Sequence, residues 1–277
     1  MKGGEESSSI MIPKDPTLDA RCVQEYRLRH SECDCFGRMK LKSFFDYAQE
    51  IAGDDASLRG MGLETLLPRH QSWFLSRMKV EIHRYPTAGK TIRVTTWASG
   101  FDRLFACREF RFEEVEPSPE GQPRGKGALI ARATSNWLLM DTAAMRILPA
   151  DRLYGEKIFA IPPGEIAFPS LGKLPSLPED TPSQLWKVRG TQIDVNGHLN
   201  NTEYASVLQD ALGMGVYPAI FQLNYLKAVP PQATLCVACQ QREGEGFLCT
   251  GRVEGALSFE AAGTLLNVEI GDNQNGI

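Results

Sequence analysis

The chain repeats a short motif, and this repeat constrains the fold more than any other feature of the sequence. Asp34-Cys35-Phe36-Gly37-Arg38 lies 160 residues before Asp194-Val195-Asn196-Gly197-His198. Apolar residues recur at helical spacing after each copy, over residues 41–52 and 204–212, and Gly213 and Gly215 end the second pattern. A motif that occurs twice, each time before a helix, predicts a fold built from two similar halves.

Alternating apolar and polar residues predict several strands after each helix. In the first half these strands cover residues 73–84, 91–97, 105–114 and 128–141, and in the second half residues 221–227, 234–237, 247–253 and 263–270. Turn residues separate the first two strands of each half. One helix followed by antiparallel strands, found twice, predicts an α+β architecture.

Prolines mark the boundary between the halves. Seven of them lie from Pro149 to Pro182, and we expect a Pro-rich linker over residues 151–185 that crosses the surface in an extended conformation. The domain organisation that follows is a disordered tail at 1–21, an N-terminal domain at 22–150, the linker, and a C-terminal domain at 186–271. The second copy of the motif falls in the C-terminal domain.

Composition excludes several classes of protein. The chain has 277 residues, of which 42% are hydrophobic and 23% charged, and a net charge of −4, so we expect a globular protein with no nucleic-acid partner. No window is apolar for long enough to predict a membrane span, and residues 1–20 lack a signal-peptide pattern. The seven cysteines have no regular spacing, which favours a reducing, cytoplasmic compartment.

The second copy of the motif carries the side chains of greatest chemical interest. Asp194, Asn196 and His198 stand at every second position, and in an extended segment such residues point the same way. A carboxylate, an amide and an imidazole that face one region could polarise a carbonyl group and activate a water molecule. Asp-x-Asn-Gly is also typical of an ordinary turn or helix cap, and Asn200 and Asn201 are predicted to be helix caps.

Other chemically active residues have no companion pattern. Cys236 and Cys239 are three apart in a predicted strand, so they should face opposite sides, and no second ligand pair accompanies them. We therefore predict no metal site and no cofactor. The remaining histidines, which are His30, His70 and His83, are predicted to be surface or structural residues.

Several segments together resemble the acyl-acyl carrier protein (acyl-ACP) thioesterases. Residues 73–86 end in Arg-Tyr-Pro as a family strand does, residues 132–140 resemble the family's Arg-Ala-Ser-Ser-x-Trp strand, and residues 194–204 match Asp-x-Asn-x-His-x-Asn-Asn-x-x-Tyr. The resemblance implies a tandem hotdog, in which two antiparallel sheets each wrap around a long helix. It also implies release of free fatty acid from acyl-ACP in fatty acid biosynthesis, with an acyl carrier protein as partner.

The resemblance assigns the catalytic residues to the second half. It implies that His198 is the base or orients the water, that Asn196 donates a hydrogen bond to the thioester oxygen, and that Asp194 holds its partners by hydrogen bonds. The matching positions of the first half are Asp34, Phe36 and Arg38, which supply neither an amide nor an imidazole. We therefore expect the first half to bind the acyl chain and not to hydrolyse it.

The chain departs from the family at one position. The family carries a glutamate on the strand after the second helix, and the matching residue is Ala228. Asp194, or less directly Glu203, could replace that carboxylate, turnover could be slow, or the protein could bind acyl chains without cleaving them. A hotdog acyl-CoA thioesterase is a further alternative, whereas no hydratase-type Asp and His arrangement is found on one helix.

Three properties stay open at this point. Monomer and homodimer are both compatible with a tandem fold. The length of the acyl chain should depend on how Phe44, Phe45, Trp73 and Trp137 close the binding tunnel. A set of basic residues could either form a docking surface for an acidic carrier protein or be solvated strand residues; they are Arg77, Lys79, Arg103, Arg108 and Arg111.

Overall fold

The computed structural model describes residues 21–116, 127–159, 166–242, 244 and 246–266. The tail expected at residues 1–21 lies outside the described residues except for Arg21. In the part of the chain that the structure describes, no helix is long and apolar enough to cross a membrane.

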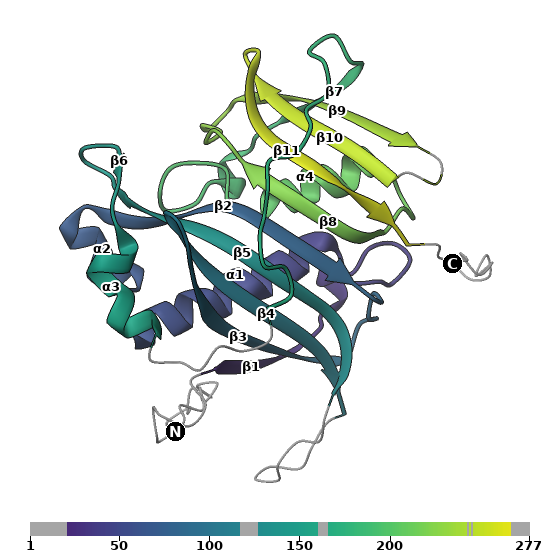
Figure 1. Ribbon diagram of the computed structural model, residues 1–277. Coiled ribbons are helices and arrows are strands. Elements are labelled where there is room, and N and C mark those ends of the chain that lie inside the picture. The colour runs from purple at the N-terminus through teal and green to yellow at the C-terminus, as the bar shows by residue number, and fades with distance from the viewer. Residues whose placement is uncertain (1–20, 117–126, 160–165, 243, 245, 267–277) are drawn as a thin grey trace, which may run out of the picture.

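The strands of both halves join into one antiparallel sheet (Figure 1). Its order is β1-β3-β4-β5-β2-β8-β11-β10-β9-β7, and β6 pairs with β5. The first half contributes β1 (Cys22–Arg27), β2 (Gln71–Ile82), β3 (Thr91–Asp102), β4 (Phe105–Val115), β5 (Ala128–Asp141) and β6 (Arg146–Ile147). The second half contributes β7 (Ser183–Lys187), β8 (Pro218–Tyr225), β9 (Thr234–Arg242), β10 (Gly246–Val253) and β11 (Ala256–Leu265). Strands β2 and β8 connect the halves, with Val80 opposite Phe221.

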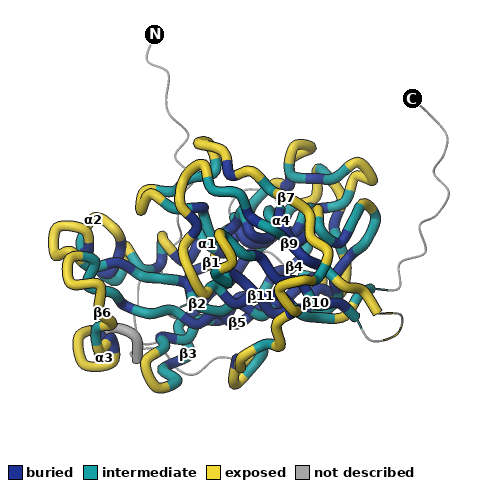
Figure 2. The backbone as a smooth tube through the Cα atoms, turned by 90° about the horizontal axis from the view of Figure 1, so that it is seen from above, coloured by how far each residue is buried: buried dark blue, intermediate teal, exposed yellow. Residues whose placement is uncertain are grey.

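Each half of the sheet packs against one main helix, α1 (Leu41–Leu58) or α4 (Glu203–Leu212). The apolar residues at helical spacing are buried in both, as Phe44 and Ile51 are in α1 and Val207 and Leu208 are in α4. Figure 2 shows the buried residues gathered along the strands and these helices, with exposed residues in the peripheral loops. The arrangement confirms the predicted tandem hotdog.

Shorter helices complete the fold. They are α2 (Leu63–Leu66) and α3 (Ala150–Phe159), with the 3-10 turns η1 (His30–Glu32), η2 (Leu67–Arg69) and η3 (Gly190–Gln192). Helix α3 occupies the start of the segment that was expected to be an extended linker, so that expectation is wrong there. Ala150 and Tyr154, which are four residues apart, are buried against the sheet. This helical spacing was present in the sequence, but the neighbouring prolines obscured it.

The chain from residue 166 to β7 crosses the outer face of the sheet (Figure 1). The Ala167 N–H donates to Glu109 Oε2 at 3.0 Å, Gln222 Nε2 donates to the Gly172 carbonyl oxygen at 2.8 Å, and Arg252 donates to the Leu177 carbonyl oxygen at 3.3 Å. Glu109 is buried beneath this segment, and burial raises the pKa of its carboxyl group. The crossing segment therefore ties strands of both halves together.

Several predicted strand limits differ from the structure. Strands β1 and β7 were not predicted, because short edge strands carry little alternation. Strand β11 begins at Ala256, after a turn in which Glu254 and Gly255 both have positive φ, and not at residue 263 as predicted. Because the turn residues lie at 254 and 255, the strand starts earlier in the chain than predicted. Its buried part is Ser258 to Ala261.

A disulfide joins Cys239 on β9 to Cys249 on β10. The two residues stand directly opposite in the register of these strands, which sequence spacing does not reveal. The irregular spacing of the cysteines was interpreted as favouring a reducing compartment, and this bonded pair departs from that interpretation. Cys236, the other member of the Cys-x-x-Cys pattern, is free.

Candidate active site

The motif around Asp194 forms a tight hairpin turn and not an extended strand. The Asp194 N–H donates to the His198 carbonyl oxygen at 2.8 Å, and the Gly197 N–H donates to the Asp194 carbonyl oxygen at 3.0 Å. Gly197 has a φ of 78°, a conformation that glycine adopts without strain. Asp194 Oδ1 also accepts the N–H groups of Asn196 at 2.9 Å and His198 at 3.3 Å. The prediction of an extended segment is therefore wrong, and the alternative interpretation as an ordinary turn is confirmed.

The first copy of the motif forms the same turn. The Asp34 N–H donates to the Arg38 carbonyl oxygen at 2.8 Å, and the Gly37 N–H donates to the Asp34 carbonyl oxygen at 3.0 Å. Asp34 Oδ1 accepts the N–H groups of Phe36 and Arg38 at 2.9 and 3.0 Å. The internal repeat thus extends to individual hydrogen bonds.

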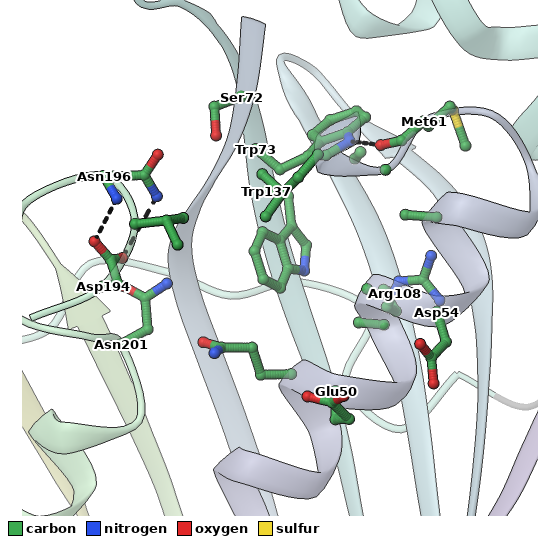
Figure 3. A pocket seen from close by; sticks show the side chains of 18 of the residues that line it. Glu50, Asp54, Met61, Ser72, Trp73, Arg108, Trp137, Asp194, Asn196 and Asn201 are labelled. Atoms are coloured by element: carbon green, nitrogen blue, oxygen red, sulfur yellow. Dashed lines mark hydrogen bonds between the residues drawn. The ribbon is translucent and has the colours of Figure 1, made fainter. Parts of the chain in front are cut away.

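A cavity of about 480 Å³ opens where the Asp194 turn faces the second part of α1 (Figure 3). Its lining comes from α1 and the loop after it, from strands β2 to β5, and from residues 193–201. Asp194, Asn196 and Asn201 form a polar wall, while Met61, Trp73 and Trp137 supply apolar surface. Trp73 is fixed by a hydrogen bond from its Nε1–H to the Met61 carbonyl oxygen at 3.1 Å. A cavity of this size that combines apolar surface with a few polar groups suits a largely apolar ligand that carries a polar group.

The buried hydroxyl of Ser72 also lines the cavity. Ser72 is 1% exposed, and its Oγ has no hydrogen-bond partner among the described residues. A buried hydroxyl without a partner costs free energy unless a ligand or solvent supplies one. Ser72 therefore marks a second point at which this cavity can bind a polar atom.

A partly buried ion cluster neutralises Arg108, which lines the cavity. Arg108 Nη2 lies 2.8 Å from Asp55 Oδ2, and Arg59 Nη2 lies 2.9 Å from Asp55 Oδ1. Burial raises the pKa of the Asp55 carboxyl group, but the two guanidinium groups together outweigh burial and hold that pKa below its usual value. Arg108 is thus a paired cation and not a free anion-binding group.

Two carboxylates of α1, Glu50 and Asp54, line the cavity opposite the motif (Figure 3). Burial raises the pKa of Asp54. Within the described part of the chain, neither residue forms an ion pair. Together with Asp194 they are the acids that a bound ligand would meet here.

The corresponding space beside the first copy of the turn is filled by Tyr217. Its hydroxyl donates to Asp34 Oδ2 at 2.7 Å, the Arg38 guanidinium lies 4.8 Å from the ring centre, and the ring of Tyr85 packs 4.9 Å away. Helix α4 ends at Leu212 and is followed by Gly213, whose φ of 99° turns the chain back toward Asp34, whereas α1 continues through the matching Gly53 to Leu58. The difference in helix length leaves the Asp194 turn beside a cavity and closes the space at Asp34.

The structure brings two of the three residues that were predicted to act together into the cavity lining. Asp194 and Asn196 line the cavity, and Asn196 Nδ2 lies 3.4 Å from Asp194 Oδ2. His198 is half-buried in the same turn but is not part of the cavity lining. Ala228 is exposed in the loop after β8, next to Val229, whose carbonyl oxygen accepts the Leu199 N–H at 2.9 Å. Position 228 is therefore one residue away from a backbone bond to Leu199, the residue that follows His198.

The residues around the start of α4 have distinct roles. Asn200 Oδ1 accepts the Thr202 N–H at 2.9 Å, but the N-cap residue of α4 is Thr202 and has no side-chain capping bond, so the prediction of Asn200 as the helix cap is not confirmed. Asn201 was also predicted to be a cap, but its side chain makes no capping bond and the residue lines the cavity instead. Glu203 accepts a hydrogen bond from Gln192 Nε2 at 3.1 Å and lies 3.5 Å from Lys42 Nζ, so it is engaged away from the cavity.

The basic residues considered for carrier docking do not form one surface. Arg108 is in the buried cluster, and Arg77 donates to the Leu171 carbonyl oxygen of the crossing segment. Lys79 lies over the ring of Phe168 in the same segment. The hypothesis of a common docking surface is therefore wrong, because the segment at residues 166–177 covers part of it.

Two of the four aromatic residues expected to close the tunnel do line the cavity, and two do not. Trp73 and Trp137 are part of its wall, whereas Phe44 and Phe45 are buried in the core. Sequence reasoning also missed Gln49 and Ser72. Gln49 could have been found, because the repeat continues along both helices and pairs it with Gln209 at the same 160-residue offset.

Known proteins match both halves of the chain. The family model of the acyl-ACP thioesterase N-terminal domain matches residues 20–151, and that of the C-terminal domain matches residues 176–254. Oleoyl-acyl carrier protein thioesterase 2 of Arabidopsis thaliana is 28% identical over 149 residues, which is 50% of this chain and 38% of the relative. Palmitoyl-acyl carrier protein thioesterase of Cuphea hookeriana is 24% identical over 195 residues, which is 65% of this chain and 44% of the relative. The chain thus spans less than half the length of these curated relatives.

Solved structures share the fold over nearly their whole length. An acyl-ACP thioesterase from Bacteroides thetaiotaomicron superposes with a TM-score of 0.75 at 18% identity, covering 89% of this chain and 98% of the other. The 12:0-ACP thioesterase from Umbellularia californica gives a TM-score of 0.75 at 21% identity, with 89% and 97% covered. Both family models, which together match more than half of the residues, agree with this fold. The chain belongs to the acyl-ACP thioesterase family.

Proposed function

We propose that this protein hydrolyses fatty acyl thioesters of acyl carrier protein and releases free fatty acid. The observation that carries the proposal is the cavity of about 480 Å³, in which the motif residues Asp194 and Asn196 form a polar wall beside the apolar surface of Trp73 and Trp137. The acyl chain would lie on the apolar side, and the thioester would meet the polar wall. The curated relatives named above are thioesterases of oleoyl- and palmitoyl-acyl carrier protein, which supports the same substrate class.

The proposed reaction is attack of water on the thioester carbon. A base takes one proton from the water, the carbonyl electron pair moves onto the oxygen, and the tetrahedral intermediate collapses when the C–S bond breaks. The departing thiolate takes up a proton. Asn196 has an amide N–H at the cavity wall that can donate to the developing oxyanion, a contribution of about 3 kcal/mol where such donors have been removed.

Two residues compete for the role of base. The motif assigns it to His198, which stands outside the cavity lining, whereas Asp194 is a carboxylate within the lining. Asp194 Oδ1 already accepts two backbone N–H bonds, so this carboxylate is engaged in holding the turn. We therefore assign the base to His198 and the orientation of the turn to Asp194. Loss of activity in Asp194→Asn but not in His198→Ala would reverse this assignment.

The test is thiol release from a panel of acyl-ACP and acyl-CoA thioesters by the purified protein. Release from carrier-protein esters that is absent in His198→Ala supports the proposal. Equal rates on coenzyme A esters would make the protein an acyl-CoA thioesterase. A binding module is favoured by the exposed Ala228 in place of an acid, and it would show saturable binding of acyl thioesters without thiol release.

The cellular setting belongs to the same proposal. We place the protein in fatty acid biosynthesis in the cytoplasm, on the grounds of its proposed substrate and the spacing of its cysteines. The Cys239–Cys249 disulfide is the observation that weighs against a reducing compartment. Thiol titration of protein prepared in a reducing medium tests the proposed cytoplasmic location. A disulfide that persists in that medium would argue for another compartment. Light scattering would distinguish a monomer from a homodimer.

A further inference from the structure

The internal repeat extends along the two main helices. Gln49-Glu50 of α1 corresponds to Gln209-Asp210 of α4, and Gly53 corresponds to Gly213, all at the offset that relates Asp34 to Asp194. The halves are therefore similar enough for one site to indicate what the other can bind. The closed site at Asp34 and the open site at Asp194 can be compared residue by residue.

In the closed site a glutamine side-chain oxygen accepts a hydrogen bond at the N-terminus of a helix. The N–H of Leu41, the first residue of α1, donates to Gln209 Oε1 at 3.0 Å. This N–H belongs to the first turn, where backbone donors have no partner within the helix. The oxygen of Gln209 therefore shows where an amide carbonyl is bound at this position.

In the open site the matching groups are the backbone N–H of Asn201 and the side chain of Gln49. Both residues line the cavity. Among the described residues, no acceptor binds the Asn201 N–H, and the Gln49 amide has no hydrogen-bond partner. Helix α1 and the turn just before α4 thus present one side-chain amide and one backbone donor to the same cavity.

An independent observation indicates that this cavity takes a ligand with a polar group. Ser72 Oγ is buried and lines the cavity without a partner among the described residues. Figure 3 shows Asn201 on the wall that carries Asp194 and Asn196, so the backbone donor lies on the polar wall. A carbonyl oxygen bound there would be next to the motif.

We propose that Gln49 is a catalytic residue that binds the thioester carbonyl oxygen. The substrate oxygen takes the position that Gln209 Oε1 has in the closed site and accepts the Asn201 N–H, while Gln49 Nε2–H donates to the same oxygen. As water adds to the carbon, the carbonyl electron pair moves onto this oxygen and both donors stabilise the charge. When the C–S bond breaks, the carbonyl reforms and the thiolate leaves. This inference rests on the proposed thioesterase function.

The first test compares variants of the two matched glutamines, Gln49 and Gln209. Gln49→Ala should lower kcat by about 10²-fold, the usual effect of removing one oxyanion donor, with little change in KM or melting temperature. Gln49→Glu should be at least as slow, because a carboxylate cannot donate and would face the developing negative charge. Gln209→Ala removes the bond to Leu41 in the closed site and should lower the melting temperature while kcat stays near that of the wild type.

The second test uses two inert analogues of a long-chain acyl pantetheine. A ketone, in which CH₂ replaces sulfur, keeps the carbonyl oxygen, whereas a thioether, in which CH₂ replaces the carbonyl, does not. Gln49→Ala should weaken binding of the ketone and leave the thioether unaffected. An unchanged kcat, or equal weakening of both analogues, would overturn the role of Gln49. If the wild type releases no thiol from any thioester, the proposed function fails, but selective loss of ketone affinity would still support the carbonyl site.

Discussion

Replacing Asp55 with asparagine should destabilise the protein strongly, because it removes a buried carboxylate that two partly buried guanidinium groups share. The Asp55 side chain is 3% exposed, and its oxygens lie 2.9 Å from Arg59 Nη2 and 2.8 Å from Arg108 Nη2. Removing one partner of a buried ion pair costs about 3–5 kcal/mol, since the remaining charge stays buried without compensation. The Arg59 and Arg108 side chains keep 16% and 11% exposure, so we expect a value near the lower limit, about 3 kcal/mol.

Urea denaturation followed by tryptophan fluorescence measures this loss. With a denaturant slope of about 2–3 kcal/mol/M, a loss of 3 kcal/mol lowers the midpoint by about 1 M. Asp46→Asn is the matched control, because Asp46 pairs with Lys42 at 2.7 Å on the same helix while the two side chains are 40% and 31% exposed. That exposed pair should contribute only about 0.3–0.5 kcal/mol.

The pH dependence gives a second check on the same reasoning. The folded-state pKa of Asp55 is lowered, so the stabilisation is present above the unfolded-state pKa of about 3.9 and is lost as the pH falls through the folded-state value. The difference between the wild type and Asp55→Asn should be constant from neutral pH down to about pH 5 and then shrink. A midpoint shift no larger than that of Asp46→Asn, or a difference that grows in acid, would refute the argument.

His198→Ala should lower thioester hydrolysis by about 10²-fold or more with an unchanged melting temperature, as expected for loss of a base; a rate near that of the wild type would remove His198 from the mechanism. Ala228→Glu should raise the rate of hydrolysis, because position 228 adjoins the backbone bond between Leu199 and Val229 and we expect a carboxylate there to reach the region of His198. Steady-state kinetics that show no gain would mean that another group already supplies the role of this carboxylate. Cys107→Ser should retain activity, since burial raises the pKa of the Cys107 thiol to about 11 and only about one molecule in 10³ would be a thiolate at pH 8. Rapid alkylation of Cys107 by iodoacetamide at that pH would contradict this.

The sequence was most informative where local chemistry determines structure. An Asp followed three residues later by Gly forms the same hydrogen-bonded turn at Asp34 and at Asp194, because the carboxylate accepts nearby N–H groups and glycine adopts positive φ without strain. The helices after both turns were predicted from apolar spacing alone. These features depend on residues that are close in the chain, so a single sequence reports them reliably.

Local pattern also misled at particular residues. Period-two spacing suggested that Asp194, Asn196 and His198 face one region, but the turn that Asp194 itself creates separates His198 from the cavity lining. The prolines after residue 149 suggested an extended segment, yet α3 forms before the first adjacent pair. In both cases a local hydrogen bond or burial against the sheet outweighed the pattern.

By itself, then, the sequence determined the two-fold repeat, the turns, the main helices and the family motif. Only the tertiary structure decided which copy of the turn keeps a cavity, because that depends on Tyr217 reaching Asp34 across 183 residues of chain. It likewise decided that Gln49 faces the same cavity as Asn201, that Asp55 neutralises Arg108, and that Cys239 meets Cys249. Such contacts depend on strand register and helix length, which are set by packing of the whole chain and not by the spacing of neighbouring residues.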